Sequence, residues 1–342
     1  MAHPRAASAA TADFRVRALG MDDALASTSL IRGDGVGWQQ TEEDLRLALT
    51  GGNALGVFQD GELVSMAALP TIAPNFGWLA YVATAPTARR RGYARQLVSQ
   101  LLLSRKQDDF TCGLYGSEMG APLYRSLGFT ERGEARLVEL RRRSVELRRR
   151  SPRVGVTRPA NLVPAAEALP QLQALDAAVY GTDRSALLNR WCQKRPGVGW
   201  VILSDDGTKA DGFVLGRPIF SSSGGTWVGP LIARDEKAAS TLLQAAIDGC
   251  EGELVQALLP RWYVYDDRSR EWHPPLSDEA ASNGEAWALA QQFAFETVGT
   301  PSLLMVRSKD EETLPPWGHR LLPEAQAMQT ARPFLATGFE FG

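Results

Sequence analysis

The stretch that decides the fold is residues 76–106, which read FGWLAYVATAPTARRRGYARQLVSQLLLSRK. Its first part is apolar and predicts a strand that ends near Thr84. A turn containing Pro86 and a loop with three arginines follow, and apolar residues at helical spacing from Gly92 onward predict a long amphipathic helix. The stretch therefore predicts a strand, a loop and a helix in direct succession.

The loop Arg89-Arg90-Arg91-Gly92-Tyr93-Ala94 has the features of an anion site. The first N–H groups of a helix have no intrahelical acceptor, and the helix dipole places partial positive charge beside them. A glycine there lets a phosphate approach the backbone closely. The loop is neither a P-loop, since no Gly-Lys-Ser/Thr follows, nor the G-x-G-x-x-G turn of a dinucleotide fold. We favour a pyrophosphate site over a merely solvated helix start.

Alternating apolar residues predict further strands around this stretch. Residues 14–19 are expected to form a first strand, and Asp60-Gly61 between two alternating runs predicts a hairpin. Thr41 followed by acidic residues is typical of a helix start. The remaining predicted elements of the first half are helices at 21–32 and 120–129 and strands at 110–116 and 134–142.

The second half repeats this order of elements without evident sequence identity. An internal duplication of the fold explains the repeated order. The predicted strands are 154–160, 199–205, 210–219, 225–233, 253–260 and 302–308, and the predicted helices are 161–181, 185–195, 235–249 and 285–293.

The pattern R-x-x-G-x-A after a strand resembles the acyl-CoA pyrophosphate loop of the GNAT acetyltransferases. APLYRSLGF (121–129) resembles their closing helix, and GVGWQQTEED (35–44) resembles a segment of a branch with two GNAT domains. The resemblance extends through the second half, in LDAAVYGTDRSALL, TWVGPLIARDEKAASTLL and the closing ATGFEFG. It implies an α/β fold of the α+β type: two tandem GNAT folds, each with a mixed, mostly antiparallel sheet flanked by helices.

The resemblance also implies roles for single residues. Backbone groups of Val82, Ala83 and Thr84 would meet the acyl carbonyl and the pantetheine arm, and Tyr124 would be the general acid for the departing thiolate. Ser117 would contact the CoA arm. The pyrophosphate would be held by the amides of Arg89, Arg90, Arg91, Gly92, Tyr93, Ala94 and Arg95; the side chains of Arg90 and Arg91 would either add phosphate contacts or face solvent.

The general base and the acceptor pocket stay open at this stage. The strand 76–84 carries no carboxylate, and Tyr115 stands where close relatives have Asp. The candidates for the base are Glu118, Asp34, a water chain and the carboxylate of Gly342. Trp38, Phe76 and Trp78 are candidates for the acceptor pocket, to which Asp34 and Glu118 are added as substrate-binding residues.

The second half departs from the family pattern at its own loop. Arg234-Asp235-Glu236-Lys237 follows the strand, with no glycine and with two carboxylates at the helix start. Acids there cap the helix themselves and repel a pyrophosphate. We therefore expect a degenerate second GNAT domain that completes the acceptor pocket or mediates dimerisation.

The expected domain boundaries follow from these elements. Residues 1–11 are expected to be a disordered leader, 12–143 the N-terminal GNAT domain and 154–308 the degenerate C-terminal one. Residues 138–151 are an immediate duplication, VELRRRSVELRRRS; we interpret its first copy as part of the strand 134–142 and its second copy as an arginine-rich solvated linker, within 144–153, rather than a surface for RNA or lipid. Residues 309–342 form a tail.

Composition excludes several classes of protein. The 37 basic and 39 acidic side chains give a net charge of −2, so no chain-wide field favours nucleic acid or a membrane surface. Three scattered cysteines indicate neither a disulfide framework nor a metal site, and no run is apolar enough for a membrane span. We expect a cytoplasmic protein without metal, either a monomer or a homodimer.

These observations together predict an enzyme. The leading hypothesis is an N-acetyltransferase that moves the acetyl group of acetyl-CoA to a primary amine of a small molecule, with the N-terminal domain catalytic and the amine attacking the thioester directly. The alternatives are a protein or peptide acetyltransferase and a non-catalytic CoA-binding regulatory module.

Overall fold

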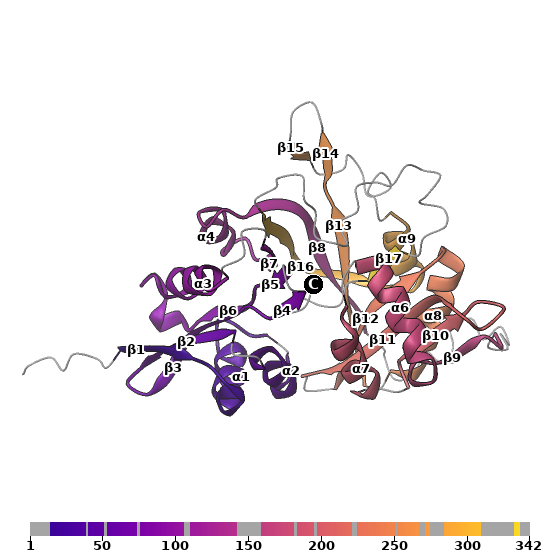
Figure 1. Ribbon diagram of the computed structural model, residues 1–342, viewed down its shortest axis with the longest axis horizontal. Helices are drawn as coiled ribbons and strands as arrows, with labels where there is room; N and C mark the ends of the chain where they lie inside the picture. The colour runs from indigo at the N-terminus through magenta and orange to yellow at the C-terminus, as the bar shows by residue number, and fades with distance from the viewer. Residues whose placement is uncertain are drawn as a thin grey trace, which may run out of the picture. The chain divides into compact units, whose positions relative to one another are not determined.

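The chain forms two compact units in a computed structural model (Figure 1). The first comprises residues 1–70 and 81–105, and the second comprises 71–80 and 106–342. The structure describes residues 14–38, 40–50, 53–73, 76–105, 110–141, 159–180, 183–194, 197–220, 224–250, 252–266, 271–273, 284–308 and 332–335.

The first unit contains a sheet in the order β1-β2-β3-β6 with helices packed on it. Asp60 and Gly61, at φ 51° and 86°, form the predicted hairpin turn. Thr41 caps α2 as predicted, since its hydroxyl accepts a hydrogen bond from the Asp44 amide at 3.2 Å. The elements are β1 (Phe14–Ala18), η1 (Met21–Asp23), α1 (Ala24–Arg32), α2 (Glu42–Leu49), β2 (Ala54–Gln59), β3 (Glu62–Ala68), β6 (Ala80–Thr84), η2 (Pro86–Ala88) and α3 (Tyr93–Leu103).

The second unit is built on a larger sheet in the order β4-β5-β7-β16-β8-β13-β12-β11-β10-β9, with β17 paired to β12. A separate hairpin is formed by β14 and β15. The strands are β4 (Thr71–Ala73), β5 (Phe76–Trp78), β7 (Thr111–Gly116), β8 (Thr130–Arg141), β9 (Leu162–Pro164), β10 (Trp200–Leu203), β11 (Ala210–Ile219), β12 (Gly225–Ala233), β13 (Leu254–Trp262), β14 (Val264–Asp266), β15 (Glu271–His273), β16 (Glu296–Arg307) and β17 (Arg332–Leu335).

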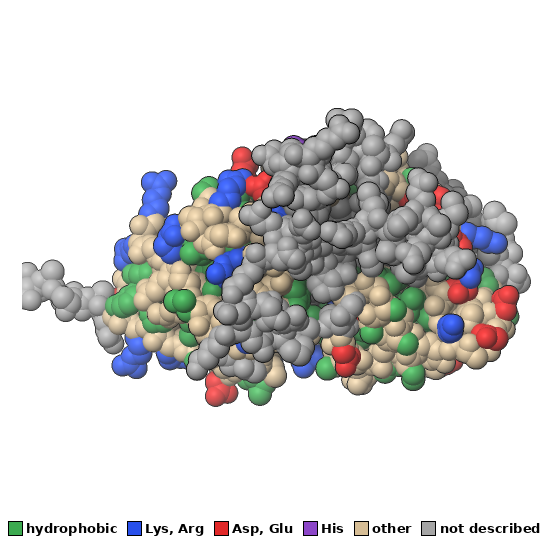
Figure 2. Space-filling model, turned by 45° about the horizontal axis from the view of Figure 1, so that its top comes forward, with side chains coloured by type: hydrophobic (Ala, Val, Ile, Leu, Met, Phe, Trp, Pro, Cys, Tyr) green, Lys and Arg blue, Asp and Glu red, His purple; other side chains and the backbone are tan. Residues whose placement is uncertain are grey.

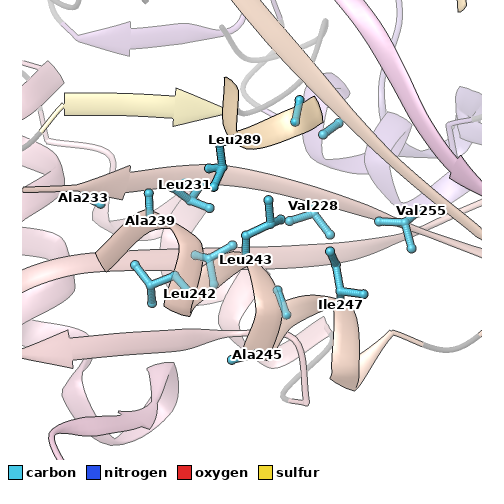
Figure 3. Close-up of a cluster of buried hydrophobic side chains, with 14 of the residues drawn as sticks. Val228, Leu231, Ala233, Ala239, Leu242, Leu243, Ala245, Ile247, Val255 and Leu289 are labelled. Carbon is cyan, nitrogen blue, oxygen red and sulfur yellow. The ribbon is translucent and has the colours of Figure 1, made fainter. Parts of the chain in front are cut away.

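Helices of the second unit bury their apolar faces against this sheet. Leu242, Leu243 and Ile247 of α8 gather with Val228 and Leu231 of β12 in one buried cluster (Figure 3). Each fully buried leucine or isoleucine contributes about 1.5–3 kcal/mol relative to an exposed one. The helices are α4 (Ala121–Arg125), η3 (Ala165–Ala168), α6 (Leu169–Tyr180), α7 (Ser185–Lys194), α8 (Glu236–Gly249) and α9 (Gly284–Gln292).

The two halves of the sequence exchange strands within this sheet. β16, from the end of the second half, lies between β7 and β8 of the first half (Figure 1). Its Leu303 is paired with Gly116 on one side and with Glu134 on the other. On its opposite edge, β8 pairs with β13 of the second half, with Val138 opposite Ala257. Each half therefore completes its sheet with a strand of the other.

A buried ion pair fixes α6 against the start of α7. Arg184 donates to Asp176 at 2.7 and 3.0 Å, and their side chains are only 2% and 0% exposed. The Arg184 guanidinium also lies 3.5 Å from the centre of the Tyr180 ring. Such a pair costs several kcal/mol when one partner is removed, because the other charge is left buried alone.

Two sequence predictions about the elements were wrong. The run 76–84 is not one strand, because it is divided at Leu79 into β5 and β6, which belong to different sheets. Leu162–Pro164 is a strand, β9, rather than the start of a helix. Leu162, Val163 and Pro164 pair with β10, and this long-range pairing overrides the local helical spacing. Most of the predicted strand 154–160, the leader, the linker and the closing ATGFEFG lie outside the described residues.

Basic and acidic side chains are both present on the face shown in Figure 2, in keeping with the small net charge. Within the described part of the chain, no helix is long and apolar enough to cross a membrane.

Candidate functional site

The end of β6 presents backbone groups on the edge that faces away from β3. The Ala85 amide donates to Val64 of β3 at 2.9 Å, and the Ser65 hydroxyl donates to the Ala83 carbonyl at 3.1 Å. Since the backbone groups of successive strand residues point to opposite edges, those of Val82 point away from β3. Tyr81, at φ 53°, interrupts the strand just before this point.

The arginine loop leads directly into the start of α3. Arg90 and Gly92 both have left-handed backbones, at φ 62° and 81°, and Gly92 is the N-cap residue of α3. The glycine has no side chain to cap the helix, and the first intrahelical bond runs from the Gln96 amide to the Gly92 carbonyl at 3.0 Å. The N-cap residue therefore takes none of the first-turn amides with a side chain, as an anion site requires.

The three arginine side chains of this loop differ in what they contact. Arg89 donates to the Thr84 carbonyl at 3.2 Å and to the Gly35 carbonyl at 2.5 Å. Arg91 donates to Gln59 and Thr87 at 3.2 and 3.3 Å. Arg90 is exposed. Two of the three guanidinium groups therefore hold the loop in place, and the Arg90 side chain faces solvent.

The glycine-rich segment 33–38 packs against the arginine loop. A side chain at Gly35, whose φ is 80°, would meet the Pro86 ring at 2.8 Å. The Trp38 amide donates to the Ile31 carbonyl at 2.9 Å, and the Trp38 ring lies 6.4 Å from that of Tyr81. Asp34 is exposed in this segment. Arg89 thus joins the segment that carries the predicted acceptor residues to the predicted phosphate loop.

Tyr124 lies in the second unit, on α4, in a closely fitted environment. The ring is 7% exposed and packs edge-on against Phe129, with ring centres 6.0 Å apart. Side chains at Gly116 or Gly120 would meet this ring at 3.2 or 3.0 Å, so both glycines leave room for it. Burial, and secondly the neighbouring Cys112, raises the pKa of Tyr124. The phenol is therefore protonated at neutral pH, as a proton donor must be.

The second half has a strand-to-helix junction of a different kind. Asp235 is the N-cap of α8, and its carboxylate accepts a hydrogen bond from the Ala238 amide at 2.8 Å. This bond lowers the pKa of Asp235, so the carboxylate is charged at neutral pH. Arg234 is paired with Asp211 at 2.8 Å. The Ala238 amide and the Arg234 guanidinium, which an anion at this helix start could use, are thus bonded to carboxylates of the chain itself.

Two protein-family models match the chain, one in each half. Both describe an acetyltransferase (GNAT) domain, over residues 33–132 and over residues 172–261. The chain belongs to the GNAT acetyltransferase superfamily. It contains two GNAT domains in tandem and is an acetyltransferase. No curated protein sequence shows significant similarity to it.

Solved structures share the fold of this tandem GNAT protein. A putative acetyltransferase from Pyrococcus horikoshii has a TM-score of 0.65 at 17% identity, over 100% of this chain and 99% of the other. A GCN5-related N-acetyltransferase from Sphaerobacter thermophilus has 0.55 at 15%, over 86% and 95%. A tandem GNAT protein from the clavulanic acid biosynthesis pathway has 0.55 at 16%, over 86% and 98%.

The other residues predicted for the GNAT site differ in how exposed they are. Trp78 is 0% exposed and lies 5.2 Å from the Tyr115 ring, in space that Gly113 leaves open. Phe76 is also buried, so both rings have a packing role rather than an exposed surface for an acceptor. Ser117 accepts a hydrogen bond from the Gly120 amide at 3.2 Å, and Glu118 is exposed.

Sequence reasoning missed the side-chain contact of Arg89 in the GNAT loop. Gly35 and Arg89 are 54 positions apart, and nothing in either segment indicates the other. Three glycines within residues 33–37 do indicate that this segment packs closely against another part of the chain, but they do not indicate which part. Among the described residues, no cluster of His, Cys, Asp and Glu suits a metal ion.

We expect Arg89→Ala to release residues 33–38 with little effect on CoA binding. The guanidinium is occupied by two carbonyl oxygens, so its loss frees the segment without removing a phosphate ligand. Hydrogen exchange of residues 33–38 should accelerate, while the Kd for acetyl-CoA should change less than about threefold, or roughly 0.6 kcal/mol. Arg90→Ala is the matched control and should leave exchange there unchanged; a large loss of CoA affinity in Arg89→Ala would contradict this role.

Proposed function

We propose that this protein is an acetyl-CoA-dependent N-acetyltransferase that acetylates a primary amine of a small molecule, and that its first GNAT domain carries the reaction. Acetyltransferase activity is established by the family. What we propose beyond this is the acceptor, the catalytic domain and the residues of its site.

The observation that carries the proposal is the difference between two helix starts. α3 begins at a glycine with a left-handed backbone, whereas α8 begins at a charged, hydrogen-bonded aspartate. The negatively charged oxygens of a pyrophosphate can accept hydrogen bonds from the backbone amides of an uncapped first turn, whereas a carboxylate in the same position repels them. The first domain therefore supports binding of acetyl-CoA, and the second does not.

The chemistry assigned to the site is direct transfer. The amine nitrogen forms a bond to the acetyl carbonyl carbon, the carbon–sulfur bond breaks, and the Tyr124 hydroxyl donates its proton to the departing sulfur. The proton released by the amine passes to solvent or to a base, for which Asp34 and Glu118 remain the sequence-derived candidates, and the Tyr124 phenolate regains a proton from solvent. The backbone groups at Val82 are assigned to the acyl and pantetheine part of the donor.

Two measurements test the proposal. Isothermal titration of the full chain with acetyl-CoA should show binding, and absence of binding would overturn the proposal. Thiol release from acetyl-CoA should then be measured with a panel of small amines and, separately, with peptides. Turnover confined to peptides would favour a peptide acetyltransferase, and tight binding without turnover on either panel would favour a regulatory module.

We expect Tyr124→Phe to lower kcat by about 100-fold, the low end of the range for loss of a general acid, with little change in the Kd for acetyl-CoA. Because the pKa of Tyr124 is raised, its proton is retained up to and beyond pH 10. The wild-type rate should therefore show no decline caused by Tyr124 below that pH. An unchanged kcat in Tyr124→Phe, with its fold intact by circular dichroism, would remove Tyr124 from the mechanism.

A further inference from the structure

The second GNAT domain has a point where two strands diverge. β12 and β13 run parallel and pair only over Gly225–Trp227, with these residues opposite Leu254, Val255 and Gln256. Beyond Trp227, β13 continues in its pairing with β8, and β12 continues to Ala233. The last residues of β12 therefore have an edge that β13 does not pair with.

The C-terminal strand β17 occupies this edge. Leu231 is paired with Leu335, Ile232 with Pro333 and Ala233 with Arg332, in antiparallel orientation. The same three residues of β12 are paired with β11 on their other edge. Since a strand has only two edges, β17 must lie on the side from which β13 has diverged.

The first domain has the same arrangement up to this point. β5 and β7 run parallel and pair over Phe76–Trp78, opposite Thr111, Cys112 and Gly113. Trp78 and Trp227 are therefore the last paired residues of two equivalent parallel pairings, each three residues long. Counting onward equally from each tryptophan, Val82, Ala83 and Thr84 correspond to Leu231, Ile232 and Ala233.

These corresponding positions have different partners. In the first domain, they are the residues whose backbone we assign to the acyl and pantetheine part of acetyl-CoA. In the second domain, they are the residues that pair with β17. The two domains also differ at the helix start where the pyrophosphate would bind. Asp235 caps α8 in the second domain, whereas Gly92 leaves α3 uncapped in the first.

We propose that β17 is a built-in ligand of the second GNAT domain, which occupies the backbone edge that the pantetheine arm takes in the first. The second site is closed by the chain's own C-terminal strand, and the protein binds one acyl-CoA. What the first domain binds rests on the proposed function; the pairing of β17 with β12 does not.

Hydrogen exchange of the full chain, with and without acetyl-CoA, tests the proposal. Amides of residues 228–235 should be protected in the free protein and unaffected by acetyl-CoA, whereas residues 80–95 should gain protection. The double variant Phe334→Pro/Leu335→Pro removes two adjacent N–H groups of β17, one of which faces β12 because the backbone groups of neighbouring strand residues point to opposite edges. Exchange in 228–235 should then accelerate at least about tenfold while β11 stays protected. Protection of 228–235 by acetyl-CoA would overturn the proposal.

A disulfide keeps the test decisive if the proline variant does not fold. Ala233→Cys with Arg332→Cys places two thiols at paired positions, within the range for a disulfide, and the native Cys112, Cys192 and Cys250 are buried. The matched control, Thr226→Cys with Arg332→Cys, sets the thiols about 23 Å apart along β12. We expect oxidation to cross-link the first pair alone. Equal cross-linking of both pairs, or of neither, would contradict the placement of β17.

Binding stoichiometry separates the two proposals. One acetyl-CoA per chain, by titration or native mass spectrometry, is expected. Two per chain would overturn the closed second site while leaving the proposed function standing. No binding, together with the expected cross-link and exchange pattern, would overturn the proposed function and leave the assignment of β17 to the second domain intact.

Discussion

Gly92→Val should abolish acetyl-CoA binding, with affinity reduced at least about 1,000-fold, or roughly 4 kcal/mol. A Cβ at Gly92 meets nothing within 4 Å, so the protein itself leaves room for the side chain. That open space is where a phosphate must lie to reach the first amides of α3. A branched side chain there excludes the ligand from its donors. Isothermal titration with acetyl-CoA measures the loss.

The control for this variant is Gly207→Val. Gly207 also has a left-handed backbone, at φ 69°, and open space around its Cβ, and it lies in the turn between β10 and β11. Both substitutions impose similar backbone strain, of order 1–3 kcal/mol, so thermal unfolding should move comparably in the two variants. Only Gly92→Val should lose CoA. Retained affinity in Gly92→Val would show that the pyrophosphate does not bind at this loop.

The first half of the chain, expressed alone as residues 1–150, should fail to form the sheet that contains β7 and β8. These strands do not pair with each other, because β16 lies between them and is supplied by the second half. Without β16, both strands have an unpaired edge, and β8 also lacks β13. Hydrogen exchange of residues 111–116 and 130–141 should be unprotected in the fragment.

Co-expression with residues 151–342 should restore that protection. Each fragment supplies a strand that the other lacks, so the two should purify together through a tag on only one of them. The break falls outside the described residues and removes no pairing described above. Protection of β7 and β8 in the isolated first fragment, at the level of the intact chain, would contradict the exchange of strands.

Local sequence patterns predicted most elements because they report local physics. Asp60-Gly61 specified its turn through left-handed backbones, and Thr41 specified the start of α2 through its hydroxyl. The partners of each strand were not predictable in this way. Alternation in 302–308 indicates a strand with one buried face, but β16 is inserted between β7 and β8 by long-range pairing. The division of 76–84 at Leu79 was not predictable either. The residues on both sides of it are mainly apolar, and only long-range pairing places β5 and β6 in different sheets.

The candidate site was predictable where backbone chemistry determines it. Gly92 at the start of a helix and Asp235 at the start of another can be read as uncapped and capped from residue type alone. Side-chain contacts between distant segments were not predictable. No local pattern indicates that Arg89 bonds to Gly35, that Trp78 is fully buried over Gly113, or that a strand of the tail pairs with β12.

The inserted strand also has a consequence for how the protein is made. On the ribosome, β7 and β8 emerge roughly 165–185 residues before β16, which at about 5–20 residues per second is a delay on the order of 10–40 s. During that time the nascent chain carries strand edges that its own first half cannot pair. Two variants whose finished folds are equally stable can therefore differ in how much of the chain aggregates before β16 is made.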